Sequence, residues 1–143
     1  MSMEMINKTI IKQYLKDLEI VIRELRKYQN RPLVDFENDI SLLWTVEHGL
    51  QVAIQNILDI GVHILAAQSK PDWEDYTEVI DKLGTNEIIP IEFARKIRGM
   101  ASFRNILVHE YATIDLEKLH QILNNNLVDF EEFIKYTISY LKM

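Results

Sequence analysis

The sequence predicts an all-α protein, an up-and-down helical bundle of four main helices and one short helix. Apolar residues recur about every 3.6 residues along nearly the whole chain, and no alternating strand of useful length interrupts them. Only four Gly and three Pro occur among the 143 residues, which favours long unbroken elements. No linker or internal repeat divides the sequence, so we expect residues 1–143 to form one domain.

The first predicted helix spans roughly residues 3–29. Arg31-Pro32 ends it, because proline disfavours the helical conformation at the residue before it. Its apolar stripe comprises Ile6, Ile10, Ile11, Tyr14, Leu15, Leu18, Val21, Ile22 and Leu25.

The second predicted helix begins within residues 35–39, where Asp and Asn side chains offer N-caps, and runs to about residue 68. Gly49 and Gly61 interrupt it, each at a cost of about 1 kcal/mol relative to Ala. These glycines therefore predict a closely approaching backbone, in the same chain or in a partner. The side chains predicted to point inward are Ile40, Leu43, Val46, Leu50, Ala53, Ile57, Ile60 and Ile64.

Three further helices complete the predicted bundle. A short helix over residues 73–83 ends at Gly84, which suits the C′ position. Pro90 suits the first turn of the fourth helix, and Asp115 is a predicted N-cap for a final helix to about Leu141. Helices of this length can leave an apolar seam exposed, and dimerisation would cover it.

Composition limits the classes of function. Hydrophobic residues make up 48% and charged residues 27%, as in globular proteins. The absence of cysteine, of a signal pattern at the N-terminus and of an apolar run of about 18 residues predicts a soluble, cytoplasmic protein with no membrane contact. A net charge of −6 counts against a DNA-binding module and confines nucleic-acid contact to a local basic pocket.

The most informative segment is residues 103–111, Phe-Arg-Asn-Ile-Leu-Val-His-Glu-Tyr, at the end of the fourth predicted helix. Helical periodicity places Arg104, Asn105 and His109 on one half of the helix. Asn105 and His109 form an i, i+4 pair that we expect to touch, with Arg104 beside them. The core-facing half of the helix is predicted to consist of Phe103, Ile106 and Leu107.

These residue types can cleave RNA without a metal. The planar guanidinium of Arg104 matches a phosphate and stabilises charge that develops on phosphorus. The imidazole of His109 can take a proton from a ribose 2′-OH or give one to the leaving 5′-oxygen, through a 2′,3′-cyclic phosphate. One histidine does not readily serve both roles at once, which favours a site composed of two copies of the chain.

A structural interpretation of the same residues stays open at this point. Arginine and histidine near a helix C-terminus are favoured by the helix dipole alone. The short pattern is therefore also compatible with a solvated helix end that has no chemistry.

The pattern Arg, four residues, His, one residue, Tyr is the signature of the HEPN superfamily, and residues 100–111 resemble its HepT-like toxin branch. Further segments also resemble that family. They are Leu58-Asp59-Ile60, His63-Ile64-Leu65, Pro71, Asp75-Tyr76, Ile88-Ile89-Pro90 and Tyr111-Ala112-Thr113-Ile114-Asp115.

The resemblance implies a homodimeric ribonuclease toxin whose Arg104, Asn105 and His109 meet at the dimer cleft. It also implies a partner, a minimal nucleotidyltransferase antitoxin of the MntA type. Such antitoxins transfer AMP to the motif tyrosine, here Tyr111, which would place anionic bulk beside Arg104. The expected substrate is RNA, and no cofactor is expected.

Several other polar residues could support the site. Asp59 and Glu47 lie among apolar neighbours of the second predicted helix. They are either ordinary exposed or paired carboxylates, or residues that orient the active-site side chains without contacting the substrate. Arg95, Lys96 and Arg98 precede the motif, either as a solvated helix face or as a basic lip for flanking RNA phosphates.

The remaining histidines and tryptophans predict no metal or base-stacking site. His48 and His63 are not an i, i+4 pair, no carboxylate stands at metal spacing, and His120 is expected to face solvent. Trp44 and Trp73 are expected to be core or interface anchors.

Two functions from different classes remain open. The first is the ribonuclease toxin described above. The second is a non-catalytic helical module that uses the same face to bind a nucleotidyltransferase or a nucleotide. A free-standing phosphate-binding fold without a partner is a third possibility, which a monomer in solution would support.

Overall fold

The computed structural model describes residues 6–68, 72–109 and 114–143. All regular secondary structure in these ranges is helical, which confirms the predicted all-α class. The helices are α1 (Lys8–Arg26), α2 (Leu33–Asn38), α3 (Ile40–Ala66), α4 (Tyr76–Thr85), α5 (Ile91–Ile97), α6 (Gly99–Val108), α7 (Leu116–Asn125) and α8 (Leu127–Leu141).

The prediction of four main helices and one short helix is wrong for the described residues, because three predicted helices break in two. Asp39 is extended, and its carboxylate accepts the N–H groups of the first turn of α3, which separates α3 from α2. At Arg98 the chain turns through a bond from the Ala101 N–H to the Arg98 carbonyl, 3.3 Å long. Asn126 separates α7 from α8.

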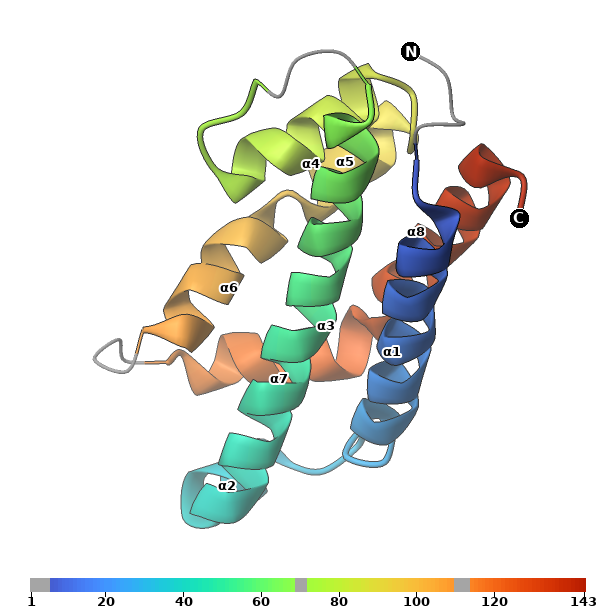
Figure 1. The fold of residues 1–143 in the computed structure, drawn as a ribbon. Helices are drawn as coiled ribbons and strands as arrows, with labels where there is room; N and C mark the ends of the chain where they lie inside the picture. Colours follow the sequence, from blue (N-terminus) through green and yellow to red (C-terminus); the bar gives the residue numbers. More distant parts are fainter. Residues whose placement is uncertain (1–5, 69–71, 110–113) are drawn as a thin grey trace.

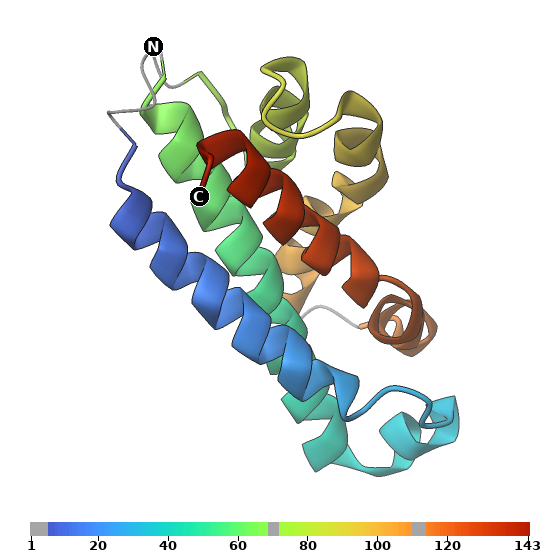
Figure 2. The ribbon, with the colours of Figure 1, turned by 90° about the vertical axis from the view of Figure 1, so that its right-hand side faces the viewer.

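α3 is the central element of the bundle (Figure 1). α1 runs antiparallel along one side of it, and α6 lies on the other side. α4 and α5 cover one end of α3, whereas α2 lies at its opposite end. Figure 2 shows α8 beside α1, where it closes the bundle. α6, which carries the motif, therefore lies against α3 and α4 and not against α1.

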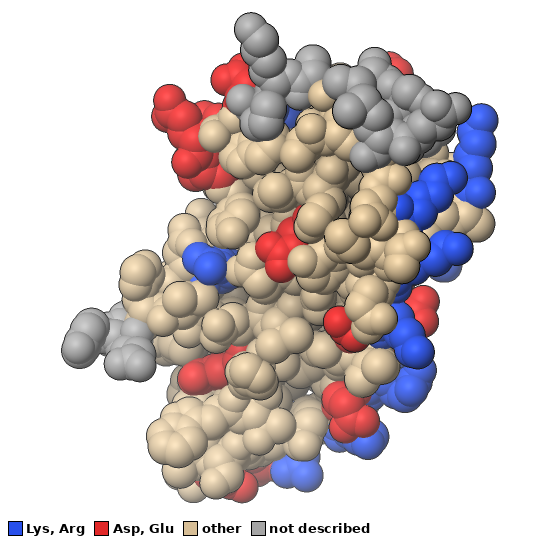
Figure 3. Space-filling view, in the orientation of Figure 1, with Lys and Arg blue, Asp and Glu red and all other residues tan. Residues whose placement is uncertain are grey.

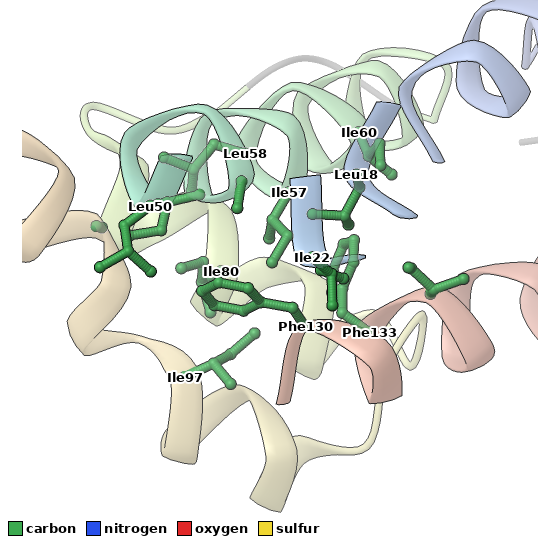
Figure 4. Close-up of a cluster of buried hydrophobic side chains, with 14 of the residues drawn as sticks. Leu18, Ile22, Leu50, Ile57, Leu58, Ile60, Ile80, Ile97, Phe130 and Phe133 are labelled. Carbon is green, nitrogen blue, oxygen red and sulfur yellow. The ribbon is translucent and has the colours of Figure 1, made fainter. Parts of the chain in front are cut away.

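The core forms where α1, α3 and α8 meet (Figure 4). The apolar stripe predicted for the second helix is buried from Val46 onward, and Leu50 and Ile57 are fully inaccessible. Ile40, at the first turn of α3, was predicted inward but is 56% exposed, because α2 does not cover it. This exposed start of α3 matters for the assembly discussed below.

Gly49 and Gly61 lie close to other helices, but their nearest neighbours are side chains and not the predicted backbone, and Gly84 corrects one helix end. A Cβ on Gly49 would lie 2.6 Å from the Leu25 side chain of α1, and one on Gly61 would lie 3.0 Å from side chains of α4. Both neighbours belong to the same chain. Gly84 is not a C′ residue: it lies inside α4, where a Cβ would come within 2.7 Å of Ala94, and the positive φ occurs at Glu87.

By length and composition alone, α3 could cross a membrane. More than half of its apolar window, 56%, is buried against the other helices, as in the core helix of a bundle.

Candidate active site

Arg104 sits on the part of α6 that packs against α3 and α4. The preceding residue, Phe103, is 4% exposed, and Ala101 is 1% exposed, so these two side chains anchor α6 on the core. Arg104 itself is half-buried. The helix therefore presents the guanidinium at the seam between helices and not in open solvent.

Two side chains hold the Arg104 guanidinium by hydrogen bonds. Its Nε donates to Oε1 of Gln55 on α3, at 2.8 Å. Its Nη1 donates to Oδ1 of the adjacent Asn105, at 3.1 Å. The structure thus brings two predicted site residues together and adds a third, Gln55, from a distant part of the chain.

Tyr76 and Asp59 extend this group to α4 and along α3. The Arg104 Cζ lies 5.2 Å from the centre of the Tyr76 ring, within the range of a cation–π contact. Gln55 Nε2 donates to Oδ1 of Asp59 at 2.8 Å, and lies 3.4 Å from the Tyr76 hydroxyl. Asp59, a predicted supporting residue, therefore reaches Arg104 through Gln55.

Local sequence explains the position of Tyr76, the first residue of α4. Asp75 is the N-cap of that helix, and its carboxylate accepts the Glu78 N–H at 2.9 Å. Glu78 in turn accepts the Glu74 N–H at 2.8 Å. The fixed start of α4 places the Tyr76 ring beside Arg104.

His109 lies outside the helix that carries Arg104. It is the C-cap of α6, with extended backbone angles (φ −84°, ψ 111°), and its N–H donates to the Asn105 carbonyl at 3.2 Å. The side chain is exposed. Within the described ranges, no hydrogen bond joins the His109 ring to the side-chain amide of Asn105. The expected side-chain hydrogen bond of this i, i+4 pair is therefore absent there.

Tyr111, the predicted acceptor of AMP, lies outside the described residues.

Two apolar side chains predicted to be covered are exposed. Ile106 was predicted to face the core but is 39% exposed, since only Phe103 and Leu107 on that side of α6 reach the core cluster. Trp44 on α3 is 62% exposed and is not a core residue, whereas Trp73 is half-buried against the core.

Glu47 lies on α3 two turns before Gln55 and is half-buried. Burial raises the pKa of its carboxyl above the usual value. Among the described residues, no hydrogen bond or ion pair connects Glu47 to the group around Arg104, in contrast to Asp59.

The three cations before the motif are each paired with a carboxylate. Arg95 pairs with Glu92 in the same helix, at 2.6 Å. Lys96 Nζ lies 2.9 Å from Oδ1 of Asp129, whose side chain is only 3% exposed, and this contact raises the pKa of Lys96.

Arg98 forms a two-pronged contact with Asp81 of α4, at 2.9 and 3.0 Å. This hydrogen-bonded contact lowers the pKa of Asp81 below its usual value. Both Arg98 and Lys96 therefore join separate helices near the break between α5 and α6.

Two other histidines, His120 and His63, contact residues outside the motif. His120 is only half-buried, and its Nε2 lies 2.7 Å from the Arg31 carbonyl while its ring meets Phe36 edge-on. His63 stacks obliquely on Tyr14. In the part of the chain that the structure describes, no group of three or more His, Asp or Glu could hold a metal ion.

Sequence comparison places these residues in a family. The sequence profile described as "Ribonuclease HepT-like" matches residues 9–137. The chain belongs to this ribonuclease HepT-like family. A tRNA nuclease HepT of Aphanizomenon flos-aquae is 28% identical over 136 residues, covering 95% of this chain and 92% of that protein. An mRNA nuclease HepT of Shewanella oneidensis is 28% identical over 99 residues, 69% of this chain and 74% of that protein.

Solved structures of HepT-like proteins share the fold. A tri-AMPylated Shewanella oneidensis HEPN toxin, solved in complex with an MNT antitoxin, superposes with a TM-score of 0.81 at 24% identity, over 91% of this chain and 97% of that one. The Bacillus subtilis cytosolic protein YutE, of unknown function, has a TM-score of 0.80 at 19% identity, over 96% of this chain and 92% of that one. At these identities the likeness extends to the fold alone.

Sequence reasoning missed two residues of this candidate site, Gln55 and Tyr76. Gln55 precedes Asp59 by four residues, a spacing that places both on one helix face and could have drawn attention to it. Tyr76 belongs to a segment that resembles the family, but nothing in the sequence indicates that its ring meets Arg104.

Proposed function

We propose that this HepT-like protein is a metal-independent endoribonuclease toxin whose active site forms across a homodimer. The observation that carries the proposal is the fixed Arg104 guanidinium at the seam of α3, α4 and α6, with the exposed His109 at the end of the same helix. The two related HepT nucleases act on tRNA and on mRNA, according to their names, which supports RNA as the substrate class.

In the proposed reaction the 2′-oxygen of a ribose attacks the adjacent phosphorus. The bond to the 5′-oxygen of the next nucleotide breaks, which leaves a 2′,3′-cyclic phosphate and a free 5′-hydroxyl. Arg104 stabilises the charge on the non-bridging oxygens. One His109 accepts the 2′-OH proton, and the other His109, from the second protomer, donates a proton to the 5′-oxygen. Asn105 holds Arg104 and orients the substrate.

Exposed apolar side chains on α2, at the start of α3 and at the end of α6 support a dimer that forms through this part of the surface. Val34, Ile40 and Trp44 are 49%, 56% and 62% exposed on α2 and the first turns of α3. Ile106 and Val108 are 39% and 36% exposed at the end of α6. Burying such a patch against a second copy is favourable, and it would bring two copies of His109 towards one groove.

The distribution of charge agrees with this face as the interface. In Figure 3 the surface over α3 and α6 is largely uncharged, whereas Lys and Arg side chains gather along the edge where α1 lies. Cores of protein interfaces are depleted in charged residues. A partner copy would therefore cover the uncharged surface and leave α1 outside.

We propose further that a nucleotidyltransferase antitoxin silences the toxin by modifying Tyr111. The tyrosine oxygen would attack the α-phosphorus of ATP, forming a phosphodiester with AMP and releasing pyrophosphate. The Shewanella toxin, AMPylated and bound to its MNT antitoxin, supports this partner. An adenylate two residues beyond His109 would introduce negative charge next to the proposed phosphate site.

The remaining predicted residues have lesser roles in this proposal. Asp59 supports the site through Gln55, and Glu47 lines the dimer face, where burial already raises its pKa. Arg95, Lys96 and Arg98 would hold flanking RNA phosphates only by exchanging their carboxylate partners for phosphate. We place the protein in the cytoplasm, with neither DNA nor a membrane as a partner.

Cleavage of RNA by pure protein in EDTA tests the catalytic part of the proposal. Wild-type protein should release fragments that end in 2′,3′-cyclic phosphate, and His109→Ala should not. Equal cleavage by both proteins would exclude the catalytic assignment.

Growth arrest on expression without the antitoxin separates a toxin from a passive binding module. A stepwise gain of one adenylate in intact mass, after co-expression with an MNT-type nucleotidyltransferase antitoxin, tests the modification. Tyr111→Phe should abolish that gain.

A further inference from the structure

We propose that Gln55 is a positioning residue for Arg104, and that Asp59 fixes the orientation of its amide. This inference rests on the ribonuclease function proposed above, because it concerns the same guanidinium. Gln55 lies 49 residues before Arg104 and outside the sequence motif, yet its side chain makes the shorter of the two hydrogen bonds to the guanidinium.

Asp59 determines which end of the Gln55 amide faces Arg104. The amide nitrogen can only donate hydrogen bonds, and the amide oxygen can only accept them. A carboxylate only accepts, so Asp59, 2.8 Å away, holds the amide nitrogen on its own side. The oxygen is then directed to Arg104, also at 2.8 Å. In this orientation the Tyr76 hydroxyl, 3.4 Å from the same nitrogen, accepts a second hydrogen bond from it.

This orientation determines which donors of Arg104 remain for substrate. A guanidinium has five N–H groups. Gln55 takes the one on Nε, and Asn105 takes one on Nη1. The guanidinium lies over the Tyr76 ring, whose centre is 5.2 Å from Cζ. Among the described residues, the other N–H groups on Nη1 and Nη2 have no hydrogen-bond partner, and they form the end of the fork that a phosphate can approach.

A neutral residue at this position preserves the charge that the reaction needs. A carboxylate in direct contact with Arg104 would form an ion pair and cancel most of its attraction for phosphate. In the structure the hydrogen-bond partner of Arg104 on α3 is the amide of Gln55. The carboxylate of Asp59 is bonded to Gln55 and reaches Arg104 only through it. Gln55 therefore orients the cation without neutralising it.

The decisive variant is Gln55→Glu, compared with Gln13→Glu. Gln13 on α1 donates to Asp17 at 3.0 Å with the same i, i+4 spacing, but α1 does not pack against α6. Both variants place a carboxylate four residues before an aspartate, and the repulsion is weaker at the exposed Gln13 than at the part-buried Gln55. The uncharged Gln55→Met variant below therefore accompanies this comparison. We expect Gln55→Glu to lower kcat for RNA cleavage on the order of 100-fold. Gln13→Glu should retain wild-type kcat, and equal kcat values for all three proteins would overturn the proposal.

A double-variant comparison separates positioning from general support of the fold. In an Arg104→Lys background, Gln55→Glu should cause little further loss, because the oriented guanidinium is already absent. Gln55→Met, which adds no charge, should lower kcat about tenfold in the Arg104 protein. Fully additive losses in the two backgrounds would show that Gln55 acts elsewhere.

An NMR measurement tests the inference without relying on cleavage. The Arg104 Nε–H signal should be resolved and slowly exchanging in wild-type protein, and should exchange at least several-fold faster in Gln55→Met. Wild-type protein that cleaves no RNA but shows this difference would refute the proposed function and leave the positioning role intact. Identical exchange in both proteins would refute the positioning role.

Discussion

The two central residues of the motif, Arg104 and His109, are held very differently by the same protomer. Arg104 is half-buried and contacts side chains of α3 and α4 as well as its own helix. His109 is exposed at the helix end, and only its backbone is bonded within the described ranges. In the proposed mechanism, one protomer would therefore preorganise the cation that binds phosphate, whereas the acid and base would acquire their geometry from a second protomer or from RNA.

The largest expected effects come from removing either residue. Arg104→Ala and His109→Ala should each lower kcat on the order of 1,000-fold, since each removes a charge or proton transfer from the transition state. Their effects on stability should differ: Arg104→Ala should lower the melting temperature because Gln55 loses its partner, and His109→Ala should not. Kinetics and thermal melts check both, and equal changes in melting temperature would contradict the comparison.

Mixed dimers test whether one active site uses the His109 side chains of both protomers. A purified dimer of one wild-type protomer and one His109→Ala protomer keeps a single His109. If both copies of His109 act in one groove, this dimer lacks either the acid or the base and should cleave RNA at least about tenfold more slowly than wild type. Differently tagged protomers allow its isolation. Half of the wild-type activity would show that each protomer works alone.

Disrupting the apolar face should separate the protomers while leaving the Arg104 contacts unchanged. We expect Trp44→Glu or Ile40→Glu to weaken dimerisation by roughly 30-fold or more, as for a central interface side chain. Ile20→Glu on α1 is the matched control, since Ile20 is 44% exposed but lies away from that face. Sedimentation equilibrium measures the change. Dimers equally stable in all three variants would place the interface elsewhere.

The sequence predicted the helical class, the buried stripe of α3 and the residues of the motif, because each depends on local periodicity or on a short pattern. Its predicted start for the second helix, within residues 35–39, includes the N-cap Asp39, but it did not predict the separate helix α2 before Asp39 or the breaks at Arg98 and Asn126. A capping carboxylate can start a new helix within an uninterrupted apolar pattern, as at Asp39, and periodicity alone does not register it.

Side-chain partners across helices were also beyond local prediction. The contact between Gln55 and Arg104 depends on the way α6 crosses α3. The predicted contact between Asn105 and His109 assumed that the helix continues to His109, but α6 ends one residue earlier. In the same way, Lys96 and Arg98 proved to be partners of carboxylates on other helices, which only the tertiary fold brings near them. Arg95 differs, because its partner Glu92 lies three residues before it in the same helix.

Smaller effects are expected from the cations that precede Arg104. Arg95→Ala and Lys96→Ala should each raise KM for RNA by no more than about threefold, since exposed charges contribute weakly. Only Lys96→Ala should lower the melting temperature, because it leaves the buried Asp129 carboxylate without its cation. A larger rise in KM for Lys96→Ala would assign it directly to the RNA-binding surface and not to support of the helices.

The smallest expected effect concerns Asp81, whose contact with Arg98 joins α4 to the helix break before the motif. That contact lowers the pKa of Asp81 in the folded protein below its usual 3.8. The pair therefore stabilises the fold at pH values above 3.8, and this contribution disappears as the pH falls through the lowered pKa. Asp81→Asn should melt slightly below wild type at neutral pH and together with it in strong acid. Asp17→Asn, which removes a carboxylate bonded to an amide, should show no such convergence. A constant difference at all pH values would mean that Asp81 acts by packing and not by its charge.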